Sequence, residues 1–173
     1  LILVALLIAA GSALLLLNKS ATIDGKKYTT ASFTDVTLDA GDMRRLRVFR
    51  KNTYISFTRC TFEPGALDAL PLRELTYVSM DNCQGVDSLG FLSDLGRIST
   101  LTIKNCGLTD DLLPETLPVS RLSRLDLSGN ALKRVPALTG TTEIMALDLS
   151  GNALTDVAPL AGCTSLTELL LGD

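Results

Sequence analysis

A phrase that occurs twice constrains this chain more than any other feature of its sequence. Residues 122–132 read Leu-Ser-Arg-Leu-Asp-Leu-Ser-Gly-Asn-Ala-Leu, and residues 144–154 read Ile-Met-Ala-Leu-Asp-Leu-Ser-Gly-Asn-Ala-Leu, an offset of 22 residues. Self-similarity at a period in the twenties is typical of a solenoid, in which each coil of chain packs against its neighbours. The chain is therefore predicted to build an elongated stack of similar coils.

The residue types in this phrase indicate a short strand followed by a turn. Leu125 and Leu127 lie two residues apart, so in a strand both side chains point to one face while Asp126 points to the other. Asn130 and Asn152 follow where the chain turns off the strand, and we expect their amides to bond interior backbone groups that no sheet reaches. A single coil cannot bury its own leucines, so the coils are expected to stack with their strands in one parallel sheet.

Weaker copies of the phrase extend the pattern toward the N-terminus. Coils are predicted to begin at residues 28, 52, 75, 98, 122, 144 and 166, and the first two are degenerate. In the second coil this alignment assigns four residues to buried positions: Ile55, Phe57, Cys60 and Phe62. The L-x-x-L-x-L-x-x-N-x-L spacing resembles the leucine-rich repeat family, and the later coils are similar to its internalin-like class of 22-residue repeats. The resemblance implies an α/β solenoid with a parallel concave β-sheet and short turns, 3-10 or helical segments on the convex side.

An uncharged aliphatic run precedes the repeats. Residues 1–17 (LILVALLIAAGSALLLL) contain no charged residue. As a helix they reach about 25 Å, close to the roughly 30 Å thickness of a bilayer core. We predict a transmembrane helix over residues 1–18, ahead of a secretory signal peptide, because no small-residue cleavage site follows the run, and ahead of a buried core helix. Residues 19–51 are then predicted to form a juxtamembrane segment and N-terminal cap, and residues 52–173 the solenoid.

The two ends of the chain raise two further expectations. The sequence stops at Asp173, one residue before the next ladder Asn is due, so the solenoid is predicted to be C-terminally incomplete. Lys19, Lys26 and Lys27 follow the apolar run and weakly favour a cytoplasmic solenoid. Resemblance to bacterial surface-anchored leucine-rich repeat proteins implies the opposite side. We therefore expect a single-pass membrane protein with an extracytoplasmic solenoid.

Three cysteines share the position that asparagine holds in the later coils. Cys60, Cys83 and Cys106 are each 23 residues apart, and Cys163 lies in a segment between strands. Neighbouring strands bring such residues within bridging distance, but their side chains are expected to point in parallel into the core, where free cysteine behaves as a small apolar residue. We predict a structural ladder of Cys60, Cys83, Cys106, Asn130 and Asn152, with thiols in preference to a disulfide or a metal site.

The composition argues against several function classes. The chain contains no His, which removes Ser-His-Asp and Cys-His nucleophile pairs, and it has no Gly-rich phosphate loop. We expect no catalytic residue, no cofactor and no metal ligand. A net charge of −3 and a pI near 5.0 make nucleic acid an unsuitable partner.

Charge is distributed unevenly along the chain. Residues 1–51 hold 8 Lys/Arg and 4 Asp/Glu, whereas residues 52–173 hold 8 and 15. The basic part includes a candidate membrane-proximal cluster: Arg44, Arg45, Arg47, Arg50 and Lys51. Such a cluster can bind anionic lipid or an acidic partner, or it can simply be a solvated face.

The outward strand positions supply the candidate partner-binding residues. The predicted register forms one column of Ser32, Ser56, Ser79, Thr102, Asp126, Asp148 and Leu170, and a second column of Thr30, Tyr54, Tyr77, Thr100, Arg124, Ala146 and Glu168. Tyrosine and arginine are typical of interface hot spots, although Thr and Tyr also suit any exposed strand. The candidates on the concave face are Tyr54, Arg59, Tyr77, Asp81, Arg124, Asp126 and Asp148.

These features predict a membrane-anchored leucine-rich repeat protein that binds protein partners and has no catalysis of its own. One alternative is an accessory or scaffold subunit of a membrane complex, held through its transmembrane helix, where Gly11, Ser12 and Ala13 allow close helix packing. Another is the sensor portion of a longer receptor or enzyme.

Overall fold

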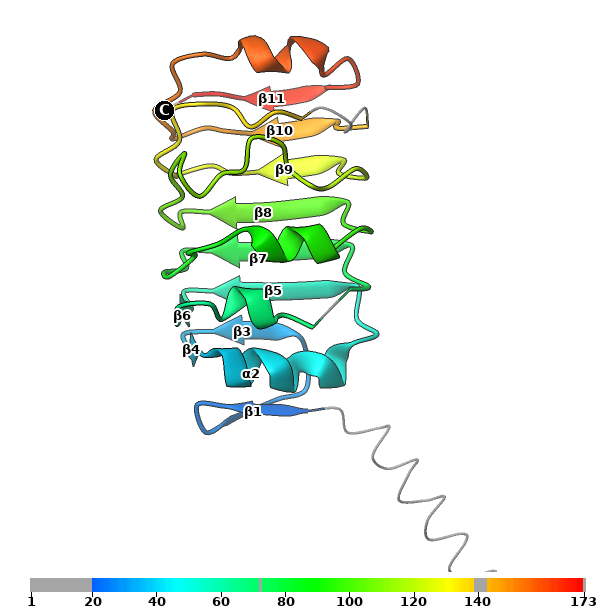
Figure 1. Cartoon of the computed structure of the whole chain (residues 1–173), viewed down its shortest axis with the longest axis vertical. Coiled ribbons are helices and arrows are strands. Elements are labelled where there is room, and N and C mark those ends of the chain that lie inside the picture. The colour runs from blue at the N-terminus through cyan, green and yellow to red at the C-terminus, as the bar shows by residue number, and fades with distance from the viewer. Residues whose placement is uncertain (1–19, 72, 139–142, 173) are drawn as a thin grey trace, which may run out of the picture.

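Seven parallel strands lie side by side in one sheet along the long axis of the molecule (Figure 1). The computed structural model describes residues 20–71, 73–138 and 143–172. In chain order the strands are β3 (Ser32–Thr34), β5 (Tyr54–Thr58), β7 (Tyr77–Asp81), β8 (Thr100–Lys104), β9 (Arg124–Asp126), β10 (Ala146–Asp148) and β11 (Glu168–Leu170). Each coil contributes one strand, so the predicted stack of seven coils with a parallel sheet is confirmed.

The pairing register confirms the predicted columns of outward residues. Tyr54 pairs with Tyr77, and Asp126 pairs with Asp148. Strands β9 and β10 have three residues, whereas β5, β7 and β8 have five. The shorter strands have a local cause, because Asp126 Oδ1 accepts the Ser128 N–H at 2.9 Å and bends the chain at that point. Asp148 and Ser150 repeat this bond.

The core lies between the sheet and the convex segments. All four residues assigned to buried positions in the second coil are at most 2% exposed: Ile55, Phe57, Cys60 and Phe62. Aromatic rings fill the N-terminal end of the core, where Phe33 stacks on Phe57 with ring centroids 5.4 Å apart. Phenylalanine fills this end because degenerate coils have lost the regular leucine spacing.

Short helices of three to six residues cover the convex side, as predicted. They are α2 (Ala40–Arg45), and the 3-10 helices η1 (Leu46–Phe49), η2 (Leu67–Ala69), η3 (Gly90–Asp94) and η4 (Ala158–Gly162). Asp39 and Asp42 form a capping box at the start of α2. The short strands β4 (Thr37–Leu38) and β6 (Thr61–Phe62) form a second parallel pair that the sequence did not predict.

A hairpin closes the N-terminal end of the core. Strands β1 (Ala21–Ile23) and β2 (Lys26–Tyr28) pair antiparallel through a turn at Asp24 and Gly25, which both have positive φ. Ile23 is buried, and Tyr28 contacts Phe33 with ring centroids 4.8 Å apart. The hairpin thus covers apolar surface that would otherwise face water.

The predicted transmembrane helix over residues 1–18 lies outside the described residues. Within residues 20–71, 73–138 and 143–172, no helix has the length and apolar character needed to span a bilayer.

Candidate functional site

Two tyrosines form the most prominent feature of the concave face. Tyr54 on β5 and Tyr77 on β7 stack with ring centroids 4.7 Å apart and an interplanar angle of 22°. Tyr54 is 44% exposed. Their neighbours in the same two columns are small or half-buried hydroxyl residues: Ser56, Ser79, Thr100 and Thr102. The aromatic pair therefore stands above a flat floor of hydroxyl groups.

Arg59 and Asp35 form an ion pair beyond the last residue of β5, at the opposite end of the strand from Tyr54. Arg59 Nε donates to Asp35 Oδ1 at 2.7 Å, and Arg59 Nη2 donates to Asp35 Oδ2 at 2.8 Å. These hydrogen bonds lower the pKa of the Asp35 carboxyl and raise the pKa of Arg59. Asp81 accepts a hydrogen bond from Asn82 Nδ2 at 2.8 Å. The predicted residues Arg59 and Asp81 thus lie at the strand ends with local partners.

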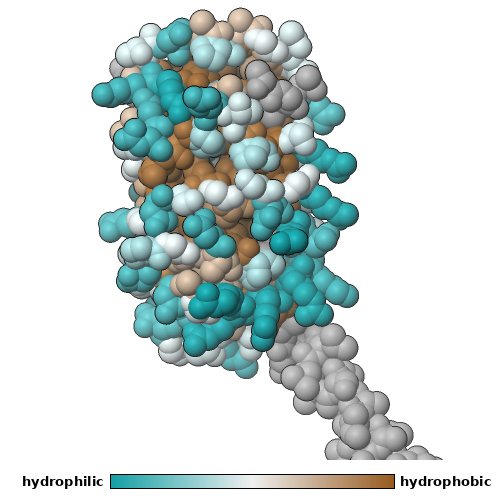
Figure 2. Space-filling view, in the orientation of Figure 1, coloured by the Kyte–Doolittle hydropathy of each residue, from teal (hydrophilic) through white to brown (hydrophobic). Residues whose placement is uncertain are grey.

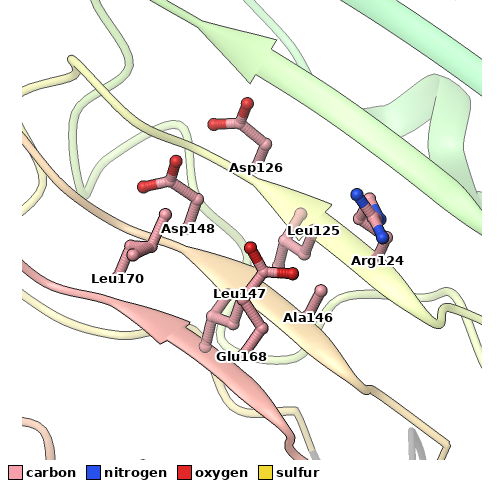
Figure 3. Close-up of a pocket in the computed structure, with 8 residues that line it drawn as sticks. All are labelled: Arg124, Leu125, Asp126, Ala146, Leu147, Asp148, Glu168 and Leu170. Carbon is pink, nitrogen blue, oxygen red and sulfur yellow. The ribbon is translucent and has the colours of Figure 1, made fainter.

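A hollow of about 110 Å³ lies at the other end of the concave face (Figure 3). Its lining comes from β9, β10 and β11: Arg124, Leu125, Asp126, Ala146, Leu147, Asp148, Glu168 and Leu170. Three carboxylates and one guanidinium give this lining an acidic balance. The predicted residues Arg124, Asp126 and Asp148 are therefore close together, and one strand, β8, separates them from Tyr77.

One carboxylate oxygen of each aspartate in the hollow already accepts hydrogen bonds from the same coil. Asp126 Oδ1 accepts hydrogen bonds from Ser128 N and Oγ, and Asp148 Oδ1 accepts from Ser150 N and Oγ. The second oxygen of each carboxylate forms no hydrogen bond with any residue that the structure describes. Two like charges on paired strand positions cost stability, and a cationic group of a partner offsets that cost.

Met145, which is 52% exposed, was not among the residues predicted for the concave face. In most coils the residue before the strand is Ser or Thr, and its hydroxyl donates to the carbonyl of its counterpart one coil earlier. Thr76 and Ser99 are examples, with distances of 3.1 Å to Thr53 O and Thr76 O respectively. Met145 interrupts this series next to the hollow, and the repeat alignment contained the signal that identifies it.

Asn130 connects two coils through its amide. Its Oδ1 accepts hydrogen bonds from Cys106 N at 3.1 Å and Leu108 N at 3.0 Å. Its Nδ2 donates to Ile103 O at 2.7 Å and Leu127 O at 2.8 Å. Asn130 therefore satisfies backbone groups on both sides of the turn.

Asn152 repeats this arrangement one coil later. Its Oδ1 accepts from Leu132 N at 3.1 Å, and its Nδ2 donates to Leu127 O and Leu149 O, both at 2.9 Å. The two asparagines thus bond successive turns in the same manner.

Thiols occupy the same position in the earlier coils. Cys60, Cys83 and Cys106 are buried free thiols, and Cys163 is a free thiol of intermediate exposure. Cys83 Sγ lies 3.5 Å from Phe57 O, the carbonyl position that Asn130 bonds in its own neighbouring coil. A thiol is a weaker donor and acceptor than an amide, so the cysteine coils are held less firmly at this position.

The thiols influence one another's protonation. A hydrogen bond to Cys83, together with burial, raises the pKa of Cys60 above its ordinary value of 9.0. A hydrogen bond to Cys106 raises the pKa of Cys83 to about 11, and the same bond lowers the pKa of Cys106.

We expect the free energy of unfolding to fall as the pH rises above about 9. The unfolded chain releases the Cys60 and Cys83 protons near the ordinary pKa of 9.0, whereas the folded chain holds them to higher pH. Stability is therefore lost above pH 9, by up to about 1.4 kcal/mol per pH unit for each such thiol. The lowered pKa of Cys106 acts with the opposite sign below pH 9.

Urea unfolding under reducing conditions, from about pH 8 to about pH 11, measures this dependence. The double variant Cys60→Ala/Cys83→Ala should lose less stability over the same range. Tyr28, whose pKa is raised by burial and to a smaller extent by Cys60, titrates in both proteins, so a small part of the difference between them comes from Tyr28. Equal slopes in the two proteins would show that the thiols do not carry the effect.

The basic cluster lies on a different surface. Its five residues are exposed on α2, η1 and the two residues that follow: Arg44, Arg45, Arg47, Arg50 and Lys51. The apolar residues between them, Met43, Leu46 and Phe49, are buried in the core. The cluster is therefore a convex surface of the first coil, separate from the concave face.

Among the described residues, no group of three or more His, Cys, Asp or Glu side chains is arranged to hold a metal ion. A larger hollow of about 440 Å³ lies on the convex side, lined by residues from Asp87 to Ser93 and from Asp111 to Pro118. Its lining is largely serine, threonine, proline and leucine, without a cluster of titratable groups.

Comparison with known proteins identifies the fold. No family model matches the sequence, and no curated protein matches it. Among solved structures, an internalin from Listeria monocytogenes is similar to this chain with a TM-score of 0.55 and 21% sequence identity. The match covers 73% of this chain and 37% of that internalin. Together with the single sheet of parallel strands, this likeness shows a leucine-rich-repeat solenoid of the internalin kind.

Proposed function

We propose that this solenoid is a protein-protein interaction module that binds its partner on the concave sheet and performs no catalysis of its own. The observation that carries the proposal is the exposed Tyr54–Tyr77 stack above a floor of small hydroxyl residues. Tyrosine is enriched in hot spots because one rigid ring provides a large contact area and its hydroxyl adds a hydrogen bond.

The acidic hollow gives the same face a second contact of different chemistry. Asp126, Asp148 and Glu168 surround it, with Ala146 and Leu170 as apolar lining. A basic side chain fits such a lining, because its stem contacts the apolar atoms while its charge meets the carboxylates. A partner that reaches from the tyrosines to the hollow crosses β5, β7, β8, β9 and β10.

We further propose that residues 1–17 hold the protein in a membrane, with the solenoid on the extracytoplasmic side. The uncharged aliphatic run supports the anchor. The resemblance to surface-anchored leucine-rich repeat proteins supports the extracytoplasmic placement of the solenoid.

Truncating both tyrosines should remove most of the binding. We expect Tyr54→Ala/Tyr77→Ala to weaken partner binding at least about 30-fold, because truncating a central hot spot costs about 2 kcal/mol or more. A photoreactive residue in place of Ser79, in the full chain within native membranes, should cross-link the partner, whereas the same group in place of Asp94 on convex η3 should not.

The control is Ser93→Ala/Asp94→Ala on convex η3, which leaves the concave face intact and should leave partner binding unchanged. Undiminished cross-linking in the tyrosine variant contradicts a concave binding site. Loss of the partner on deletion of residues 1–17, while the solenoid stays folded, instead favours a subunit held through its apolar run.

A further inference from the structure

The first coil carries a basic face, defined as Arg44, Arg45, Arg47, Arg50 and Lys51. Met43, Leu46 and Phe49 recur every third residue along α2 and η1, and all are at most 1% exposed. The basic residues occupy the positions between them and are exposed. The core thus fixes the orientation of this segment and leaves mainly basic groups, with a half-buried Val48, on the outside. Figure 2 shows hydrophilic side chains gathered over this end of the molecule.

Three of the arginines form a row. Residues three apart lie nearly above one another in a 3-10 helix, which rises about 2.0 Å per residue. Arg44 near the end of α2, Arg47 in η1 and Arg50 directly after η1 have this spacing. Their side chains therefore leave the backbone in similar directions over a length of about 12 Å. Such a row suits a surface with many anionic groups better than it suits a single ion.

The charges of this face are largely uncompensated. Arg45 pairs with Asp42 at 2.5 Å. Arg44, Arg47, Arg50 and Lys51 form no ion pair with any residue that the structure describes.

Several arginines of the later coils have local partners. Arg59 pairs with Asp35 at 2.7 Å, and Arg97 pairs with Glu74 at 2.7 Å. Arg134 donates to the carbonyl oxygens of Asp110 and Leu113. The fold therefore pairs Arg59, Arg97 and Arg134 with local partners, while it maintains several like charges next to one another on the first coil against their mutual repulsion.

We propose that the basic face binds the phosphate groups of anionic phospholipids and seats the first coil on a membrane surface. Guanidinium groups bind phosphate oxygens in pairs of hydrogen bonds, and each basic residue near an anionic surface is worth roughly a fivefold gain in partitioning. Lys26 and Lys27 are exposed on β2 in the hairpin that covers the same end of the core.

The rest of the molecule favours the same orientation. Residues 52–173 carry 8 Lys/Arg and 15 Asp/Glu, so an anionic membrane repels them. Lipid binding on the convex side of the first coil thus leaves the concave face accessible, and repulsion of the acidic later coils tilts them away from the bilayer. In sequence, three residues separate the apolar run from β1. The four peptide links from Leu17 to Ala21 span at most about 14 Å. The inference therefore rests in part on the proposed membrane anchor.

Lysine footprinting of the full chain tests the proposal. The chain is mixed with nanodiscs of phosphatidylcholine alone, or with one third phosphatidylglycerol, and acetylation of each lysine is followed by mass spectrometry. Lys51 should react at least about fivefold more slowly on the anionic discs. This protection should disappear at about 0.5 M salt, where charge interactions are screened within a few ångströms. The exposed residues Lys104 and Lys133 serve as internal controls and should react at equal rates.

A pair of charge-matched variants locates the effect. Arg44→Gln/Arg47→Gln/Arg50→Gln should abolish the protection of Lys51, and Arg73→Gln/Arg97→Gln/Arg121→Gln, with the same change in net charge, should retain it. Equal labelling of Lys51 on neutral and anionic discs overturns the proposal. Protection in native membranes but not on anionic discs overturns it as well, because it points to an acidic protein partner.

Carbonate extraction separates this inference from the anchor. A chain that is extracted by carbonate, yet shows protected Lys51 on anionic discs, lacks the anchor but retains the lipid-binding face. A chain that resists extraction, yet shows no protection, is anchored without using its basic face.

Discussion

Replacing Asn130 by alanine is expected to destabilise the solenoid by about 3 to 5 kcal/mol. The change removes acceptors from Cys106 N and Leu108 N and donors from Ile103 O and Leu127 O. Each buried backbone group left without a partner costs about 1 to 3 kcal/mol, and relaxation of the turn recovers part of the sum. Urea unfolding followed by circular dichroism measures the loss.

The chain contains its own control for this experiment. Asn130→Cys gives this coil the residue type that Cys106 has at the equivalent position one coil earlier. There the Cys106 thiol lies 3.6 Å from the carbonyl oxygen of Met80 and 3.1 Å from that of Lys104. We expect this variant to lose about 1 to 2 kcal/mol, because the weak thiol bonds replace only part of the amide network. An alanine variant that loses less than about 1 kcal/mol contradicts the role of Asn130.

Gly85→Ala should destabilise the protein by about 2 to 5 kcal/mol. Gly85 has φ +73°, and a Cβ built on it lies 2.0 Å from the backbone oxygen of Phe62. The left-handed conformation costs a residue with Cβ about 1 to 2 kcal/mol, and the added overlap costs about 1 to 3 kcal/mol more. Phe62 cannot move away freely because β6 pairs with β4. Thermal and urea unfolding of the variant measure both contributions together.

Gly107→Ala separates the two contributions. Gly107 has φ +69°, but a Cβ there meets no atom within 4 Å. This variant should therefore lose only about 1 to 2 kcal/mol, from the backbone conformation alone. Equal losses at the two positions would mean that the approach of Gly85 to Phe62 is not what requires glycine.

The repeat pattern predicted the strands because the same residues determine both periodicity and burial. Leu125 and Leu147 occupy equivalent positions in the phrase, and the structure pairs them directly. Strands β4 and β6 could not be predicted in this way. Thr37 and Leu38 have no local pattern, and they become a strand only through the neighbouring Thr61 and Phe62. The β1–β2 hairpin had a local signal, the Asp24-Gly25 pair, which the repeat search did not use.

Some contacts of the candidate residues on the concave face were likewise predictable from the repeat pattern, and others were not. The register placed Tyr54 beside Tyr77, and the repeat spacing was sufficient for that prediction. The pairing of Arg59 with Asp35 was not predictable, because both residues have positive φ, 51° and 54°. The equivalent positions of the later coils are glycines, Gly129 and Gly151. A left-handed residue changes the direction of its side chain, and the apolar pattern contains no information on that change.

The aromatic residues of the first coils also determine how this protein can be observed. The sequence has no Trp and 3 Tyr, of which Tyr28 packs on Phe33 in the hairpin and the other two form the concave stack. The tyrosine fluorescence and near-ultraviolet dichroism of the free chain therefore arise largely from Tyr54 and Tyr77. Occupation of the concave face thus alters an intrinsic optical signal, and ligands that lack aromatic groups can be titrated without a label.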